Sequence, residues 1–274
     1  MVYIEKSTAM NRLICFFILL SPLLGIGIAP GGPESKTPAD ENPSTPAHIL
    51  KNYQVVWEDN FDGTTLNTSK WKYRNEGKPA GKYATVSKNN IALDGKGCLL
   101  IKFTKDRDGK YHTGSVHTRN TFETTYGYFE CRAAMNKQLG PEVVFRLYSA
   151  DYGKTLDPAK DGASISIFQY HRESPDKIQH AVSWNSGADR QKVNKVIQLK
   201  DIGDGFHTFG LEWTKDEYIF YVDGKETWRT SEGVSQHNEH LVLLADLAGW
   251  GGDPVQGNFP DAVTFDYIRV FKPK

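Results

Sequence analysis

Short runs of alternating apolar and polar residues recur along the chain, with turn residues between them. Phe206–Trp213 reads FHTFGLEW, and Asp223-Gly224 separates Tyr218–Val222 from a further run at 225–228. Successive side chains on a strand point to opposite faces, and Asp-Gly between two such runs is typical of a two-residue hairpin. No long stretch has apolar residues at helical spacing. The pattern predicts an all-β sandwich of two antiparallel sheets, with further strands at 55–57, 98–103, 126–133, 143–147, 178–184, 240–247 and 263–271.

One run, DGASISIFQYH at 161–171, carries polar residues on an otherwise apolar strand. Ser164 and Ser166 share one face of this strand, while two isoleucines share the other. Gln169 follows Ser166 by three residues, which is out of phase for a regular strand. A bulge of one residue would return Gln169 to the serine face, and bulges are frequent beside active sites. We therefore expect three small polar side chains in a row on one face.

This segment resembles the signature strand of glycoside hydrolase family 16, E-[IL]-D-[IV]-[FM]-E. Flanking motifs resemble the family in the same order: TYGYFECR at 125–132, FHTFGLEW at 206–213, YIFYVDGK at 218–225 and FDYIRVF at 265–271. The resemblance covers roughly 53–272. It implies a concanavalin-like jelly roll with a concave cleft for a β-linked polysaccharide, either a glucan or a galactan.

The resemblance assigns the family's nucleophile position to Ser164, its helper aspartate to Ser166 and its acid/base to Gln169. Retaining glycosidases need two carboxyl groups about 5–5.5 Å apart, one to attack and one to protonate the leaving oxygen. Serine without an adjacent base is a weak nucleophile, and an amide has no proton to donate as a general acid. We expect a pseudoenzyme that binds polysaccharide but does not hydrolyse it by the family's mechanism.

The neighbouring strand also departs from the family, which usually has a WPAFW-like run where this chain reads GPEVVFRL at 140–147. Glu142 and Arg146 take the positions of the two tryptophans and share a strand face, so we expect them to pair in the cleft. The alternative is an active O-glycosyl hydrolase that uses a relocated carboxylate. Glu142 is its first candidate, followed by Asp161, Glu173 and Asp246.

Four more residues match cleft positions of the family and are expected to bind substrate together with Glu142 and Arg146: Tyr170, His171, Trp184 and Trp250. Aromatic faces provide flat apolar surfaces on which sugar rings can stack. The alternative for the two tryptophans is that they pack at the rim of the sandwich.

A structural Ca²⁺ on the convex side is common in the family, and Asp266 matches one of its ligands in the final strand. The resemblance therefore implies a calcium site that includes Asp266, with an ordinary surface aspartate as the alternative. No other cofactor is required.

The charge of the chain is balanced, with 33 basic and 33 acidic residues. This balance gives no reason to expect nucleic acid or an anionic membrane as a partner. We expect a monomer whose partner is the polysaccharide.

The N-terminal part of the chain predicts export. Residues 14–29 form an apolar run that ends in small residues and is too short to span a membrane, so 1–29 is predicted to be a signal peptide, with an uncleaved anchor as the alternative. Residues 30–48 are rich in Pro, Ser and charge, which predicts a disordered tether and leaves 49–274 as the domain. The protein is expected to be secreted, periplasmic or held at the cell surface. A structural or adhesive surface role with a vestigial cleft is a further alternative.

Two cysteines, Cys98 and Cys131, remain once the signal is removed. In an exported protein they either form a disulfide or stay as two buried thiols. Two thiols are the favoured interpretation.

Overall fold

The computed structural model describes residues 44–187 and 189–274. The predicted signal peptide and most of the predicted tether lie outside the described residues. Within the described part, no helix is long and apolar enough to cross a membrane.

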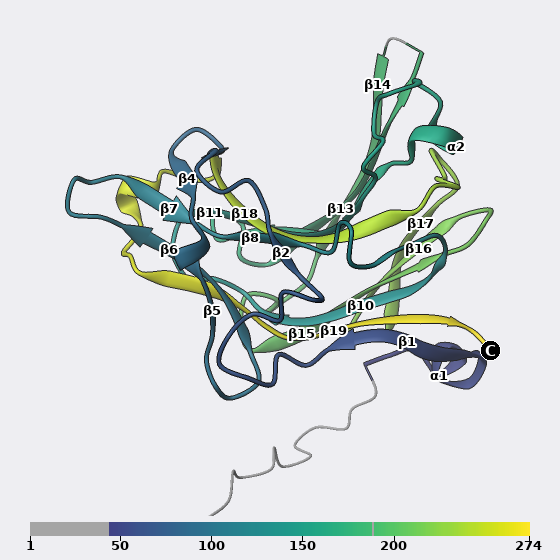
Figure 1. The fold of residues 1–274 in the computed structure, drawn as a ribbon, viewed down its shortest axis with the longest axis horizontal. Coiled ribbons are helices and arrows are strands. Elements are labelled where there is room, and N and C mark those ends of the chain that lie inside the picture. Colours follow the sequence, from purple (N-terminus) through teal and green to yellow (C-terminus); the bar gives the residue numbers. More distant parts are fainter. Residues whose placement is uncertain (1–43, 188) are drawn as a thin grey trace, which may run out of the picture. The chain divides into compact units, whose positions relative to one another are not determined.

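Two sheets are stacked face to face, as the alternation predicts (Figure 1). The first sheet has the order β17-β16-β15-β10-β19-β6-β7-β4-β3, with β1 paired to β19 and β5 paired to β6. Its strands are β1 Tyr53–Asp59, β3 Pro79–Ala80, β4 Ala84–Val86, β5 Ile91–Leu93, β6 Leu99–Lys105, β7 Tyr111–Thr113, β10 Gly127–Ala134, β15 Phe206–Trp213, β16 Tyr218–Val222, β17 Lys225–Thr230 and β19 Asp261–Pro273.

The second sheet has the order β14-β13-β12-β11-β18-β8-β2, with β9 paired to β18. Its strands are β2 Lys72–Tyr73, β8 Ser115–His117, β9 Glu123–Thr124, β11 Gly140–Tyr148, β12 Ser164–His171, β13 Lys177–Ser186, β14 Asp189–Gln198 and β18 Glu239–Gly251. Short helical turns complete the fold at α1 Ala47–Asn52, η1 Lys88–Asn90, α2 Pro158–Asp161 and η2 Pro254–Gln256.

The core lies between the two sheets and is built from the alternate apolar residues of each strand. Phe168 on β12 and Phe209 on β15 are both fully buried, and their ring centroids are 4.2 Å apart, so this contact joins one sheet to the other. The free face of the second sheet is the concave face. In Figure 1 it opens upward, between the β13–β14 hairpin and the segment that carries β4 and β7.

The predicted strands are present, with small shifts at their ends. The Asp-Gly hairpin joins β16 to β17, and both turn residues have the positive φ that a two-residue hairpin of this kind requires: 47° at Asp223 and 72° at Gly224. Sequence analysis missed β14, because nearly all of its residues are exposed and the strand therefore lacks the alternation of a half-buried strand.

The packed chain begins before the predicted domain start at Ile49. Ile49 itself is fully buried against Tyr128 and Tyr221 on the convex face of the first sheet. Thr45, in the predicted tether, is also buried and donates a hydrogen bond from its hydroxyl to Glu130, at 2.9 Å. The end of the predicted tether therefore belongs to the folded domain, because its few apolar and hydroxyl groups find partners on the sheet.

The two cysteines are not joined by a disulfide in the described part of the chain. Cys131 is buried, and burial raises the pKa of its thiol. Cys98 is partly buried. This agrees with the favoured expectation of two thiols, except that only one of them is fully buried.

Candidate functional site

The predicted bulge in β12 is present and places three polar side chains on the concave face. Ser164 lies opposite Tyr148 of β11, Ser166 opposite Arg146 and Gln169 opposite Val144. Residues 144, 146 and 148 share one face of β11, so their three partners do too. The register shift between Ser166 and Gln169 leaves one extra residue on β12, and this residue returns Gln169 to the serine face.

Among the described residues, neither serine has a base as its cross-strand neighbour. Ser164 is flanked across the sheet by Tyr148 and Ser183, and Ser166 is flanked by Arg146 and Ala181. A serine hydroxyl without a neighbouring histidine or carboxylate is not activated as a nucleophile.

Gln169 is held in a row of amides rather than acids. Its side-chain oxygen accepts a hydrogen bond from the Gln179 amide at 2.7 Å, and the Gln179 oxygen accepts from Asn194 at 3.4 Å. The row crosses β12, β13 and β14. These amide groups can bind hydroxyl groups, but they cannot transfer a proton to a leaving group.

The expected ion pair between Glu142 and Arg146 is not formed: no ion pair of 4.0 Å or less joins them in the described chain. Glu142 instead lies directly opposite Asp246 of β18. Burial, and then the charge of Asp246, raise the pKa of Glu142, while burial raises the pKa of Asp246. The expectation was wrong because Glu142 and Arg146 are four residues apart along β11, about 13 Å at the rise of a strand, whereas Asp246 is a cross-strand neighbour.

Arg146 instead belongs to a group of basic and aromatic residues at the centre of the concave face. Its guanidinium lies over the ring of Tyr148, 5.7 Å from the centroid. The Tyr148 ring is edge-on to that of His240, with centroids 5.9 Å apart, and His240 is edge-on to His117, at 5.5 Å. Arg74 follows β2, where its backbone N–H donates to the carbonyl of Ser115 on β8. Its charge acts on both His117 and Arg146, lowering the pKa of each, so its guanidinium belongs to the same group.

Sequence analysis did not single out Arg74, His117 and His240. Each lies on or beside a strand, where a polar residue ordinarily faces solvent. The one available signal was the alternation in β18, which places polar His240 and Asp246 on the same face as two apolar residues.

Two of the expected substrate-binding aromatics face the core instead. Tyr170 and Trp184 are buried in the main hydrophobic cluster between the sheets. Tyr170 lies opposite Val143, a core residue, because the bulge that turns Gln169 to the cleft turns its neighbour away. Trp184 follows Ser183, which faces the cleft, and packs against Gly233. The placement of both residues in the cleft was wrong.

The other two remain at the surface. His171 is half-buried on the concave face, opposite Glu142. Trp250, at the end of β18, is 70% exposed. Tyr83, also exposed, lies beside Gly249 and adds a second aromatic ring at this end of β18.

The remaining carboxylate candidates are elsewhere. Asp161 is buried and accepts hydrogen bonds from the backbone N–H groups of Thr155 and Leu156, at 2.6–2.8 Å, so it holds a loop together. Glu173 is exposed in the turn after β12.

The side chains around Asp266 do not favour calcium. Arg132 donates a hydrogen bond to Asp266 at 2.8 Å, and a guanidinium at this position competes with a cation. No group of three or more His, Cys, Asp or Glu that suits a metal ion is found among the described residues. The calcium site stays a prediction, and no step below uses a metal.

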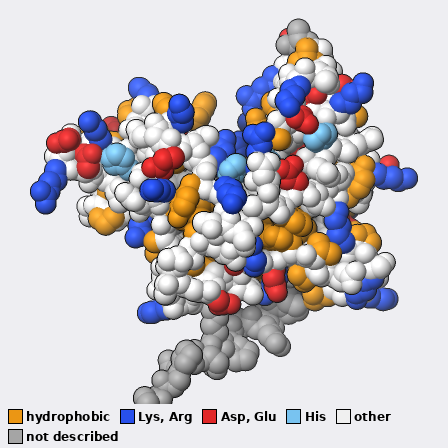
Figure 2. Space-filling model, viewed as in Figure 1, with side chains coloured by type: hydrophobic (Ala, Val, Ile, Leu, Met, Phe, Trp, Pro, Cys, Tyr) orange, Lys and Arg blue, Asp and Glu red, His pale blue; other side chains and the backbone are white. Residues whose placement is uncertain are grey.

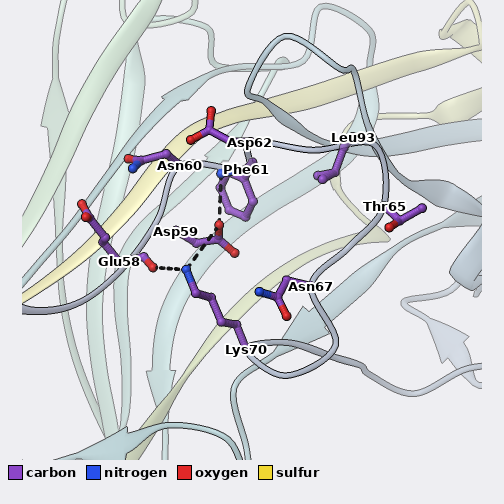
Figure 3. Close-up of a pocket in the computed structure, with 9 residues that line it drawn as sticks. All are labelled: Glu58, Asp59, Asn60, Phe61, Asp62, Thr65, Asn67, Lys70 and Leu93. Atoms are coloured by element: carbon purple, nitrogen blue, oxygen red, sulfur yellow. Dashed lines mark hydrogen bonds and ion pairs between the residues drawn. The ribbon is translucent and has the colours of Figure 1, made fainter.

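A pocket of about 220 Å³ lies outside the cleft, after β1 (Figure 3). The Lys70 ammonium group points into it, donating to the Glu58 carbonyl at 2.6 Å and lying 3.8 Å from the Asp59 carboxylate. Asp59 also accepts from the Trp71 indole at 2.8 Å. These polar groups hydrogen-bond or pair with one another, so we regard the pocket as structural.

Comparison with known proteins identifies the family. The sequence model described as "Glycosyl hydrolases family 16" matches residues 78–268. A β-glucanase of Rhodothermus marinus is 26% identical over 283 residues, which cover 93% of each chain. A keratan-sulfate endo-1,4-β-galactosidase of Sphingobacterium multivorum is 25% identical over 80% of this chain, which spans 55% of that protein.

Among solved structures, a glutamate-to-serine variant of SCLam, a non-specific endo-β-1,3(4)-glucanase, superposes with a TM-score of 0.67 at 26% identity. The match covers 80% of this chain and 95% of that one. Together with the jelly-roll architecture and the bulged signature strand, these matches show that the chain belongs to glycoside hydrolase family 16.

Proposed function

We propose that this protein binds a β-linked polysaccharide in its concave cleft and does not hydrolyse it by the two-carboxyl mechanism. The observation that carries the proposal is the geometry of β12, which keeps its bulge and its row of three cleft-facing side chains. Those three are Ser164, Ser166 and Gln169. The scaffold of the site is retained, while both groups needed for attack and protonation are absent from it.

The relatives support a glycan as the ligand. The β-glucanase of Rhodothermus marinus matches nearly the whole chain. The SCLam variant, in which serine replaces a glutamate, presents 1,3-β-D-cellobiosyl-glucose at its active site. A serine in place of a glutamate is therefore compatible with a bound oligosaccharide in a cleft of this family.

Binding and hydrolysis are tested separately on the full chain. Isothermal titration with laminarin, mixed-linkage glucan and a galactan is expected to give saturable binding to at least one of them. Affinity is expected to fall for Trp250→Ala, because the exposed indole offers a face for a sugar ring. A long-incubation reducing-end assay on the same polymers is expected to give no product. Flat titrations with every polymer would refute the binding proposal.

A second candidate function, hydrolysis by relocated carboxylates, is favoured by one specific observation. Glu142 and Asp246 are directly opposed across β11 and β18. Side chains in this relation have Cβ atoms about 4.5–5.5 Å apart, so their carboxyl groups can approach the separation of about 5–5.5 Å that retaining enzymes use. The raised pKa of each group also favours a protonated partner that can act as an acid.

The same reducing-end assay decides between the two functions. Product that disappears in Glu142→Gln and in Asp246→Asn would establish the relocated pair. Glu232→Gln, which removes an exposed carboxylate that is not among the candidates, is the matched control and would leave such activity unchanged.

Export and a surface location remain part of the proposal. Expression of the full chain in a secreting bacterial host, followed by N-terminal sequencing, is expected to yield a mature protein that begins near Pro30. If the exported protein binds no glycan, the adhesive or structural alternative gains support.

A further inference from the structure

The centre of the concave face concentrates positive charge over an apolar floor. Val144, Val242 and Leu244 form a small buried cluster on this face, separate from the core. Arg146 pairs with Val242, and Val242 pairs with His117. Neighbouring strands are about 4.8 Å apart, so the Cα atoms of Arg146 and His117 are about 10 Å apart, with only the short valine between them.

Figure 2 shows the result from outside: Lys, Arg and His side chains gather at the floor of the hollow between the two raised parts of the domain. Arg74 is the residue directly after β2, and its backbone N–H bonds to the carbonyl of Ser115 on β8, which places it at the edge of this group. Both arginines lie partly buried, and long cationic side chains in such a position lose hydration that something else must replace.

In the part of the chain that the structure describes, the two guanidinium groups lack direct counter-ions. Within residues 44–187 and 189–274, neither Arg74 nor Arg146 forms an ion pair at 4.0 Å or less, and the Nε atom of Arg146 is buried without an acceptor. Burial, and then the charge of Arg74, lower the pKa of Arg146. Asp246 acts on both arginines from a greater distance.

The carboxylates of the cleft do not cancel this charge. Asp246 and Glu142 oppose each other across β18 and β11, and burial raises the pKa of both. They interact with three cationic groups, Arg74, Arg146 and Lys192. At the rim, Glu123 and Arg119 add one charge of each sign. Positive charge therefore remains in excess at the centre of the cleft.

The two histidines add neutral hydrogen-bonding groups. Burial and the nearby arginines lower the pKa of His117 to about 4 and that of His240 to about 3. At neutral pH each imidazole is uncharged and has one N–H to donate. The Nδ1 atom of His240 is buried without a partner in the described chain.

Resting on the proposed function, we infer that the cleft selects an anionic β-linked polysaccharide, whose sulfate or carboxylate group lies between Arg74 and Arg146. Guanidinium groups bind such groups through paired, charge-assisted hydrogen bonds. The anion supplies the missing counter-charge, and the Tyr148 ring and the apolar floor contact the sugar that carries it.

Three forms of one polymer test this selection: laminarin, which is neutral, laminarin sulfated chemically, and laminarin oxidised to carboxylates at C6. Titration of the full chain is expected to give at least ten-fold tighter binding to one or both anionic forms, and that difference is expected to shrink as NaCl is raised. Which form binds more tightly identifies the anionic group.

Variants locate the anion. Arg146→Gln and Arg74→Gln are each expected to weaken binding of the preferred anionic polymer roughly ten- to hundred-fold, as for a lost charged hydrogen bond, and to weaken binding of neutral laminarin by a smaller factor. Arg107→Gln removes an equal charge from an exposed loop outside the cleft and is the matched control. Thermal unfolding of each variant checks that it is folded.

Three outcomes would overturn the inference. Equal affinity for the neutral and anionic forms would remove the selection while leaving the proposed glycan binding intact. An equal loss of affinity for the anionic polymer in Arg107→Gln and Arg146→Gln would show non-specific attraction of a polyanion. Absence of binding to all three forms and to the neutral glucans and galactan above would end the proposed function and this inference together.

Discussion

Glu142 of β11 and Asp246 of β18 are cross-strand partners, so two carboxyl groups face each other on the concave side of the sheet. Like charges at this spacing destabilise each other, and burial adds to the cost of ionising them. The pair interacts with Arg146, which moderates the effect without ion-pair contact.

Removing one member of the pair is expected to change the other. In Asp246→Asn the negative charge opposite Glu142 is lost, so the pKa of Glu142 is expected to fall toward its ordinary value. A pH titration of the glutamate carboxyl carbons by NMR measures this change. Asp216→Asn, at an exposed position, serves as the control, and an unshifted Glu142 in Asp246→Asn would contradict the cross-strand coupling.

Glu239 is expected to make stability depend on pH. Its side chain is fully buried, its Oε1 atom accepts a hydrogen bond from the Ala163 N–H at 2.8 Å, and burial raises its pKa from 4.5 to about 8. The folded protein therefore binds a proton that the unfolded chain releases between pH 4.5 and 8. Its contribution to stability is present below pH 4.5 and is lost as the pH rises toward 8.

Thermal unfolding between pH 5 and 8.5 checks this dependence. The wild-type Tm is expected to fall as the pH rises, and Glu239→Gln, which cannot ionise, is expected to flatten the fall and to be more stable than wild type at pH 8.5. Glu232→Gln, at an exposed position, is expected to keep the wild-type slope. A Glu239→Gln protein with the full wild-type slope would show that another group is responsible.

Restoring the three carboxylates is expected to restore hydrolysis. The bulge already places positions 164, 166 and 169 on the cleft face, so Ser164→Glu, Ser166→Asp and Gln169→Glu together return both catalytic carboxyl groups to one strand. Reducing ends are expected from a β-glucan with the triple variant and not with Ser164→Glu alone, which lacks the acid. A folded triple variant that binds a glucan without cleaving it would show that Arg146 and Glu142 also block the reaction.

Trp184 and Trp250 are predicted to contribute differently to stability. Trp184 is packed in the core beside Gly233, so Trp184→Ala is expected to reduce the free energy of unfolding by about 3–5 kcal/mol. Trp250 is exposed, and Trp250→Ala is expected to change it by less than about 0.5 kcal/mol. Urea unfolding measures both. A large loss of stability in Trp250→Ala would mean that this side chain has a structural contact.

The sequence alone determined the sandwich, because alternation of apolar and polar residues specifies which side of each strand is buried, and the Asp223-Gly224 turn specifies one hairpin. It also predicted a bulge in the signature strand, since the three-residue spacing from Ser166 to Gln169 is out of phase for a regular strand, and the structure shows this bulge. The same three residues carry no carboxyl group, which is the observation behind the proposed lack of hydrolysis.

Only the tertiary structure decided which polar residues of different strands meet. Alternation along one strand says nothing about the register between strands, and a shift of one residue exchanges the two faces. For this reason the partner of Glu142 is Asp246 rather than Arg146, and the bulge that brings Gln169 into the cleft sends Tyr170 into the core. The grouping of Arg74, Arg146, His117 and His240 has the same origin: four short segments, distant in the sequence, become neighbours only when β2, β8, β18 and β11 pair in order.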